Sequence, residues 1–181
     1  MRKIITVYLL LAGLLMARPI VYDFVAPAGA GGTSYANAGG SGDRTGTVTM
    51  AESNVSVLAS ETLLINGVSG TGTAYFNGYP TFINDGDWFS FDFGSPKVID
   101  EIKWYQQTST SHGTWKVQGS TDNSSWSDVG TTFTLGSSTT QTITEINGNT
   151  ADYRYWRLFL VTGPSSNVPY LFEIEFKIGT P

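Results

Sequence analysis

Residues 172–178 read FEIEFKI, and this stretch decides the fold class. Its four apolar residues alternate with three charged ones. Successive side chains of a β-strand point to opposite faces of the sheet, so this pattern places one face in a core and the other in water. It predicts a half-buried strand.

The same alternation recurs along the rest of the chain. In Trp88–Phe93 three phenylalanines share one face, and in Thr114–Ser120 apolar and polar residues alternate. Turn-forming residues such as Gly94-Ser95-Pro96 separate the candidate strands. Further candidates are Thr47–Met50, Val55–Leu58, Val98–Tyr105, Thr131–Leu135, Gln141–Ile146 and Tyr153–Val161.

About eight short strands, with no convincing amphipathic helix among them, predict an all-β fold. Each half-buried sheet needs a partner for its apolar face, so we expect two antiparallel sheets packed face to face in a β-sandwich of jelly-roll type. We expect four tryptophans in its core, namely Trp104, Trp115, Trp126 and Trp156.

The composition excludes several functions. Ten basic and fifteen acidic residues give a net charge of −5, which offers no basic surface to the phosphates of a nucleic acid. The chain has no cysteine, and therefore neither a disulfide nor a zinc site that needs sulfur. Its single histidine, His112, excludes a centre with several histidine ligands. We expect no nucleic-acid partner.

Residues 1–17 combine two basic residues with a short apolar run, a pattern typical of an export signal and too short for a stable membrane span. Two other interpretations stay open. Translation could start at Met16, or the apolar run could stay and pack against this fold or a neighbouring subunit. Residues 18–46 are expected to form a short strand and a Gly/Ala-rich spacer, and residues 47–181 the folded domain.

Four motifs follow one another in the order typical of a known family. They are Phe91-Asp92-Phe93-Gly94-Ser95-Pro96, the stretch from Trp115 to Trp126, Arg154-Tyr155-Trp156-Arg157-Leu158, and Glu173-Ile174-Glu175. Over about residues 60–178 the chain resembles the discoidin-like family, also called coagulation factor 5/8 C-terminal domains or family 32 carbohydrate-binding modules.

The resemblance implies a galactose-binding-like jelly roll of about eight antiparallel strands that binds glycans through loops at one end. Members often use an arginine near Arg154 and Arg157 for the ligand or for bracing the sheet. We favour bracing for both, because an arginine stem can cover apolar surface while its head pairs with a carboxylate.

A sugar presents apolar C–H patches and hydroxyl groups, so its receptor needs an aromatic plane and nearby hydrogen-bonding side chains. The candidate carbohydrate contacts are Tyr75, Tyr79, Gln106, His112, Asn167 and Tyr170, all in predicted loops. Structural alternatives stay open for several of them. His112 could cap the turn before Gly113, Tyr75 could fill a core position, and Tyr170 could pack beneath its loop.

Many family members hold a structural calcium ion with an acidic segment before the first core strand. The matching position here, Ile65-Asn66-Gly67-Val68, lacks both carboxylates. Calcium takes about six to eight oxygen ligands, with formal negative charge among them. Asn66, Glu173 and backbone carbonyls remain as candidate ligands for a weakly bound structural calcium.

We therefore expect a non-catalytic carbohydrate-binding module for adhesion, displayed extracellularly or on a virion surface. Its partner would be a cell-surface or polysaccharide glycan, and its working form a homo-oligomer. A catalytic triad would have to use His112, and no G-x-S-x-G motif is present. The alternative is a structural or decoration protein of a phage virion or surface assembly, in which the sandwich packs against other proteins of that assembly.

Overall fold

A computed structural model of the chain describes residues 32–53, 61–70, 84–106, 111–136, 138–163 and 171–179. These residues form seven strands, all paired antiparallel, and one short 3-10 helix. In chain order the elements are β1 (Thr49–Glu52), η1 (Glu61–Ile65), β2 (Trp88–Gln106), β3 (Thr114–Ser120), β4 (Ser127–Thr134), β5 (Thr140–Ile143), β6 (Asp152–Thr162) and β7 (Leu171–Gly179).

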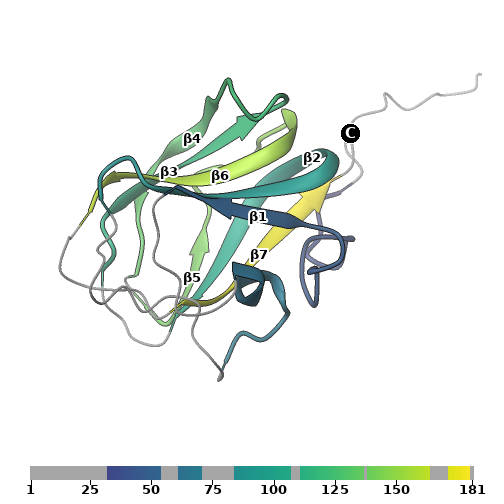
Figure 1. Cartoon of the computed structure of the whole chain (residues 1–181), viewed down its shortest axis with the longest axis horizontal. Coiled ribbons are helices and arrows are strands. Elements are labelled where there is room, and N and C mark those ends of the chain that lie inside the picture. Colours follow the sequence, from purple (N-terminus) through teal and green to yellow (C-terminus); the bar gives the residue numbers. More distant parts are fainter. Residues whose placement is uncertain are drawn as a thin grey trace, which may run out of the picture.

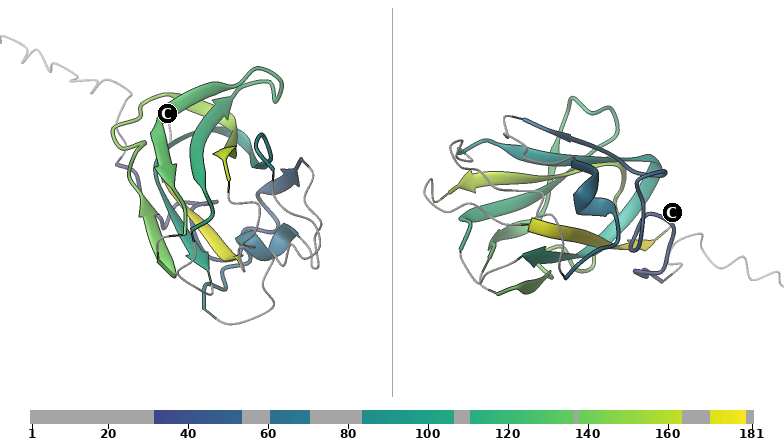
Figure 2. Two further views of the ribbon diagram at one scale, coloured as in Figure 1. Left: turned by 90° about the vertical axis from the view of Figure 1, so that its left-hand side faces the viewer. Right: turned by 60° about the horizontal axis from the view of Figure 1, so that its bottom comes forward.

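The long strand β2 belongs to both layers of the molecule (Figure 1). Its first half lies between β1 and β6, in the order β1-β2-β6-β3-β4. Its second half pairs with β5 and β7, and the register shifts between Asp92 and Lys97, where the strand passes from one layer to the other. Figure 2 shows the two layers facing each other. The prediction of an all-β sandwich is confirmed.

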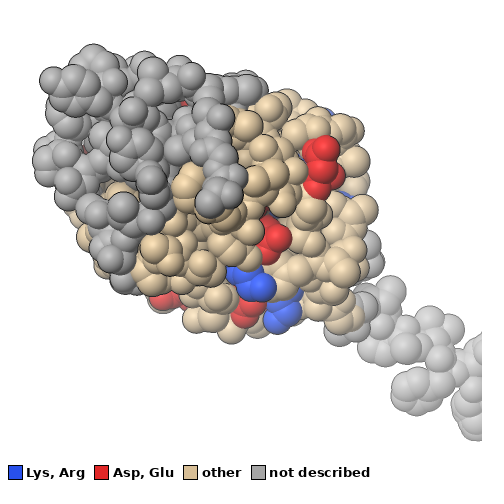
Figure 3. Space-filling view, turned by 90° about the horizontal axis from the view of Figure 1, so that it is seen from below, with Lys and Arg blue, Asp and Glu red and all other residues tan. Residues whose placement is uncertain are grey.

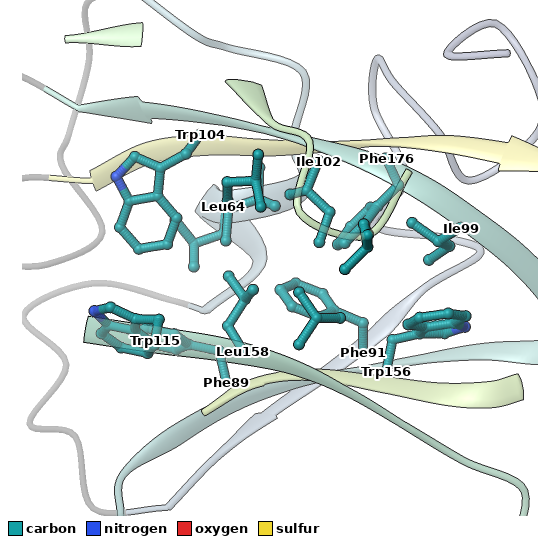
Figure 4. Packing of buried hydrophobic residues seen from close by; sticks show 14 of the residues in the cluster. Leu64, Phe89, Phe91, Ile99, Ile102, Trp104, Trp115, Trp156, Leu158 and Phe176 are labelled. Carbon is teal, nitrogen blue, oxygen red and sulfur yellow. The ribbon is translucent and has the colours of Figure 1, made fainter. Parts of the chain in front are cut away.

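Apolar side chains from both layers fill the space between them (Figure 4). Trp104, Ile102 and Phe176 point in from one layer, and Trp115 and Phe91 from the other. The rings are in direct contact. Those of Phe89 and Trp115 stack with centroids 5.9 Å apart. Removing this much apolar surface from water is the main free-energy gain of folding.

Three of the four predicted core tryptophans are confirmed, because Trp104, Trp115 and Trp156 are almost completely buried. Trp126 is a correction. It precedes β4 on the outer face of the sheet, is half-buried, and lies against the guanidinium of Arg157 at 4.1 Å from the ring centroid. Its apolar ring is covered by the cation of Arg157 from β6 and not by the core.

Two expectations about chain breaks are also corrected. Gly94-Ser95-Pro96 was expected to end a strand, but β2 continues through it as an irregularity in the ladder. Residues 32–46 were expected to belong to a spacer. They pack on β7 instead, where Ser34 pairs with Ile178 and Arg44 is buried. Polar side chains hold this segment together with its backbone, because the Thr33 hydroxyl donates to Asp100 and the Tyr35 hydroxyl to Glu101, each at 2.8 Å.

The strand expected at Val55–Leu58 lies outside the described residues. In the described ranges, no helix is long and apolar enough to cross a membrane.

Candidate functional site

We call one end of the sandwich the loop end, because the predicted sugar-binding loops start or finish there. It is defined by the last residues of β2 and β6 and the first residues of β3 and β7 (Figure 1). Thr114 pairs with Thr162 across β3 and β6, and Gln106 pairs with Leu171 across β2 and β7. The predicted contacts Gln106 and His112 therefore come to the same end of the fold.

Gln106 is buried, with 3% of its surface exposed, and its side chain is used inside the protein. Its Oε1 accepts a hydrogen bond from the indole N–H of Trp104 at 2.6 Å, and its Nε2 donates to the carbonyl oxygen of Gly136 at 3.4 Å. The expectation of an exposed loop residue is corrected. Gln106 ends a strand, and an unbonded Trp104 indole in the core would cost free energy.

His112 is buried to the same degree, and this too differs from the expected exposed loop. Its backbone N–H donates to Leu135 O at 2.8 Å, and its carbonyl accepts from the Trp115 indole at 2.8 Å. Both ring nitrogens are buried, and neither has a hydrogen-bond partner in the part of the chain that the structure describes. Burial lowers the pKa of His112 to about 4, so the ring is neutral at pH 7. It presents one donor and one acceptor.

The other four candidate contacts, Tyr75, Tyr79, Asn167 and Tyr170, lie outside the described residues. The Asp85-Gly86-Asp87 turn braces this end, a role that the sequence did not reveal. The backbone N–H of Gly163, just after β6, donates to Asp85 at 2.8 Å. Asp87 is buried and accepts from Ser53 at 2.9 Å and from the backbone of Asn84 at 2.7 Å. The Asp-Gly-Asp spacing was the available signal.

Arg154 braces the sheet, as expected. Its Nε and Nη2 donate to the two carboxylate oxygens of Asp92, each at 2.8 Å. This two-bond contact holds the pKa of Asp92 below its usual value. Arg157 also contacts its neighbours across the sheet, because its Nε donates to Gln118 at 2.7 Å.

The two candidate calcium ligands, Asn66 and Glu173, both have hydrogen-bond partners inside the protein. The Glu173 carboxylate contacts Nη2 of Arg44 and accepts from the backbone N–H of Gly67 at 3.1 Å. The side-chain oxygen of Asn66 accepts from Val68 at 2.9 Å. Among the described residues, no group of three or more acidic or histidine side chains could hold a metal ion.

The oxygens in this region converge on Arg44 instead. The Arg44 side chain donates to the backbone carbonyls of Gly40 at 3.0 Å, Gly42 at 3.1 Å and Ile174 at 2.6 Å, besides its contact with Glu173. Burial raises the pKa of Glu173, and the arginine opposes this rise. Carbonyl and carboxylate oxygens are the ligands that calcium prefers, and in this region they surround the Arg44 guanidinium.

Comparison with known proteins decides the family. The family model of the NedA-like, galactose-binding domain matches residues 64–158, which is more than half of the chain. The protein belongs to this family. No curated protein sequence matches the chain.

Solved structures share the fold of this galactose-binding-like domain. The C-terminal domain of a chitobiase from Bacteroides fragilis has a TM-score of 0.55 at 11% identity, covering 74% of this chain and 94% of that domain. The family 32 carbohydrate-binding module of Clostridium perfringens NanJ, in complex with galactose, has a TM-score of 0.53 at 12% identity, with 73% and 94% covered.

A further family 32 module from C. perfringens, in complex with GalNAc-β-1,3-galactose, has a TM-score of 0.55 at 10% identity, with 73% of this chain and 96% of that one covered. At these identities the likeness concerns the fold alone. The galactose-binding-like domain thus has the fold of a carbohydrate-binding module.

Proposed function

We propose that this galactose-binding-like domain is a non-catalytic carbohydrate-binding module, used for adhesion outside the cell or on a virion surface. The observation that carries the proposal is membership of a galactose-binding domain family together with the fold of family 32 modules. Fold does not by itself fix function, so the support must also come from the site.

The frame of the loop end supports a preformed site. The backbone N–H of His112 donates to the carbonyl oxygen of Leu135 at 2.8 Å, and the backbone N–H of Leu135 donates to the carbonyl oxygen of Gly113 at 3.0 Å. Gly136 donates to Gln141 at 2.9 Å. Loops that start from a fixed frame lose less conformational entropy when a ligand binds.

At this end the ring of His112 supplies polar atoms that a ligand could hydrogen-bond. A buried donor and a buried acceptor without partners are costly, and a hydroxyl group or a water molecule that reaches the ring would satisfy them. Because the ring is neutral, it can pair with neutral hydroxyls. A triad needs its histidine bonded to a serine and an acid, and among the described residues the His112 ring nitrogens have no such partner.

The net charge of −5 favours a neutral glycan over an anionic one. Charged side chains are few and of both signs on the described part of the face in Figure 3. A shallow sugar site should bind one monosaccharide with a Kd on the order of 0.1–1 mM, or about 4–5.5 kcal/mol. Adhesion would then need several linked copies, because linked sites gain avidity without new contacts.

The test is binding of the full chain, multimerised on a tag, to a glycan array that includes galactose-terminated glycans. We expect hits that are lost with Tyr79→Ala and weakened with His112→Ala. Thr150→Ala, an exposed residue far from the loop end, is the control. An array without hits above background contradicts the proposal and favours the packing role in a virion or surface assembly, in which residues 4–25 would dock on a neighbour.

A further inference from the structure

A cavity lies at the end of the sandwich opposite the loop end. It has a volume of about 290 Å³ and is partly open to solvent, between β4 at 128–130, the turn at 145–151 and Tyr153 in β6. Tyr153 and Thr162 lie near opposite ends of β6, nine residues apart, which corresponds to about 30 Å. This cavity, which we call the Tyr153 cavity, is therefore separate from the proposed sugar site.

The walls of the cavity are fixed before any ligand arrives. A side chain on Gly130 would meet the carbonyl oxygen of Glu145 at 2.1 Å, so strand and turn touch through their backbones. Asn149 ties the turn to the second layer, donating to Ile99 O at 3.0 Å and to Ala151 O at 2.9 Å. Ile146, in the same turn, is buried in the core. A fixed wall keeps the entropic cost of binding low.

The ring of Tyr153 is held as firmly as the cavity walls. A side chain on Gly119 would overlap the ring at 2.1 Å, so the ring lies directly on the glycine. The Trp156 ring meets it edge-on at a centroid distance of 5.4 Å. Tyr153 therefore closes this end of the core and also lines the cavity. It supplies the apolar plane on which the C–H face of a sugar ring can lie.

The polar groups of the lining are free to bind. The side chains of Glu145 and Asn147 are exposed and, like the hydroxyl of Tyr153, make no hydrogen bond or ion pair within the described part of the chain. The Asp128 carboxylate, by contrast, is held by Lys116 at 2.9 Å and Gln118 at 2.5 Å. The Glu145 carboxylate, the Asn147 amide and the Tyr153 hydroxyl thus line the cavity beside the Tyr153 ring. Together they can accept hydrogen bonds from the hydroxyl groups of a sugar and donate hydrogen bonds to them.

We propose that the Tyr153 cavity binds one neutral monosaccharide unit and gives the domain a second glycan contact. Its volume is at the lower end of small-molecule sites, which suits a single sugar ring. None of its lining residues, all of them described, is a lysine or arginine, so the free carboxylate of Glu145 would repel a uronic or sialic acid. The class of ligand rests on the proposed function, while the site does not.

The test is an amide NMR titration of the full chain with neutral monosaccharides, galactose and N-acetylgalactosamine first, and with glucuronic acid as the anionic comparison. We expect saturable shifts at 145–149 and Tyr153 with the neutral sugars. Glu145→Gln combined with Asn147→Ala should weaken this binding about tenfold, which is about 1.4 kcal/mol. Thr150→Ala, in the same turn but outside the lining, should leave it unchanged.

The titration distinguishes failure of the loop-end site from failure of the Tyr153 cavity. Shifts confined to the loop end, at Gly113, Gly136 and Gly163, would overturn the second site and leave the proposed function standing. Shifts confined to the Tyr153 cavity would support the second site and contradict the proposed one. Equal binding of glucuronic acid at the cavity would overturn the neutral-sugar assignment, and shifts at neither end would overturn both sites.

Discussion

Arg44 and Glu173 form an ion pair inside the protein although 129 residues separate them in the sequence. Their side chains are 1% and 0% exposed. The pair joins the segment before β1 to β7, and Nε, Nη1 and Nη2 of Arg44 also donate to backbone carbonyls. A buried charge is tolerated only when it is paired and bonded in this way.

Removing one partner should therefore destabilise the protein strongly. Arg44→Met leaves the Glu173 carboxylate buried without its cation, and we expect a loss of about 3–5 kcal/mol in the free energy of unfolding. Urea denaturation followed by tryptophan fluorescence measures it. The double variant Arg44→Met/Glu173→Leu, with neither charge, should be more stable than Arg44→Met alone. Equal stability of the wild type and Arg44→Met would contradict a buried pair.

The same pair predicts that the fold does not depend on calcium. A ligand that binds the folded state raises the Tm as its concentration increases. Since Glu173 is occupied by Arg44 and Gly67, we expect the same Tm in excess EDTA and in excess calcium chloride. Magnesium chloride at equal ionic strength is the control. A Tm that rises with calcium alone would show that the oxygens around Arg44 can rearrange to bind it.

His112 predicts a specific pH dependence. Its pKa falls from 6.5 to about 4 through burial, so between these values the unfolded chain binds a proton that the folded chain does not. Stability due to this group is complete above pH 6.5 and is lost as the pH falls towards 4.

The measurement is the difference in unfolding free energy between wild type and His112→Phe at several pH values, because all other groups titrate in both. We expect the wild type to lose about 3 kcal/mol relative to the variant between pH 7 and pH 4. A difference that is independent of pH would mean that the histidine ring reaches water.

Gly119 is expected to tolerate no side chain. A methyl group there would overlap the Tyr153 ring at 2.1 Å, so Gly119→Ala should cost about 1–3 kcal/mol and displace the ring from the Tyr153 cavity. Gly46→Ala is the matched control, since nothing lies within 4 Å of its added carbon, and it should change stability by less than about 0.5 kcal/mol. Thermal unfolding of both variants, compared with the wild type, measures these changes in stability.

The fold was predictable because each strand carries its own signal. The alternation over Thr114–Ser120 gives β3 with the bounds that the structure has, and the FEIEFKI stretch lies within β7. The failures have local causes. Gly94-Ser95-Pro96 is a turn by composition, but hydrogen bonds to β6 on one side and to β7 on the other keep β2 in one piece.

The site was harder to predict than the fold. Gln106 and His112 are polar residues at the edge of a predicted loop, and nothing in their neighbourhood in the sequence reveals that Trp104 and Leu135 hold them inside. Arg44 shows the same limit. In a Gly-rich segment it has the pattern of an exposed residue, and only its contact with Glu173 explains its burial.

The sequence by itself determined the two pleated layers through its periodicity and the family resemblance through the order of its motifs, because alternation and motif order are properties of neighbouring residues. The tertiary structure alone decided which polar groups are hydrogen-bonded inside the fold and which remain available to a ligand. Arg44, Gln106 and the Tyr153 cavity all depend on contacts between residues far apart in the sequence. Such contacts exist only once the layers have packed, because burial and hydrogen-bond partners are set by the assembled core.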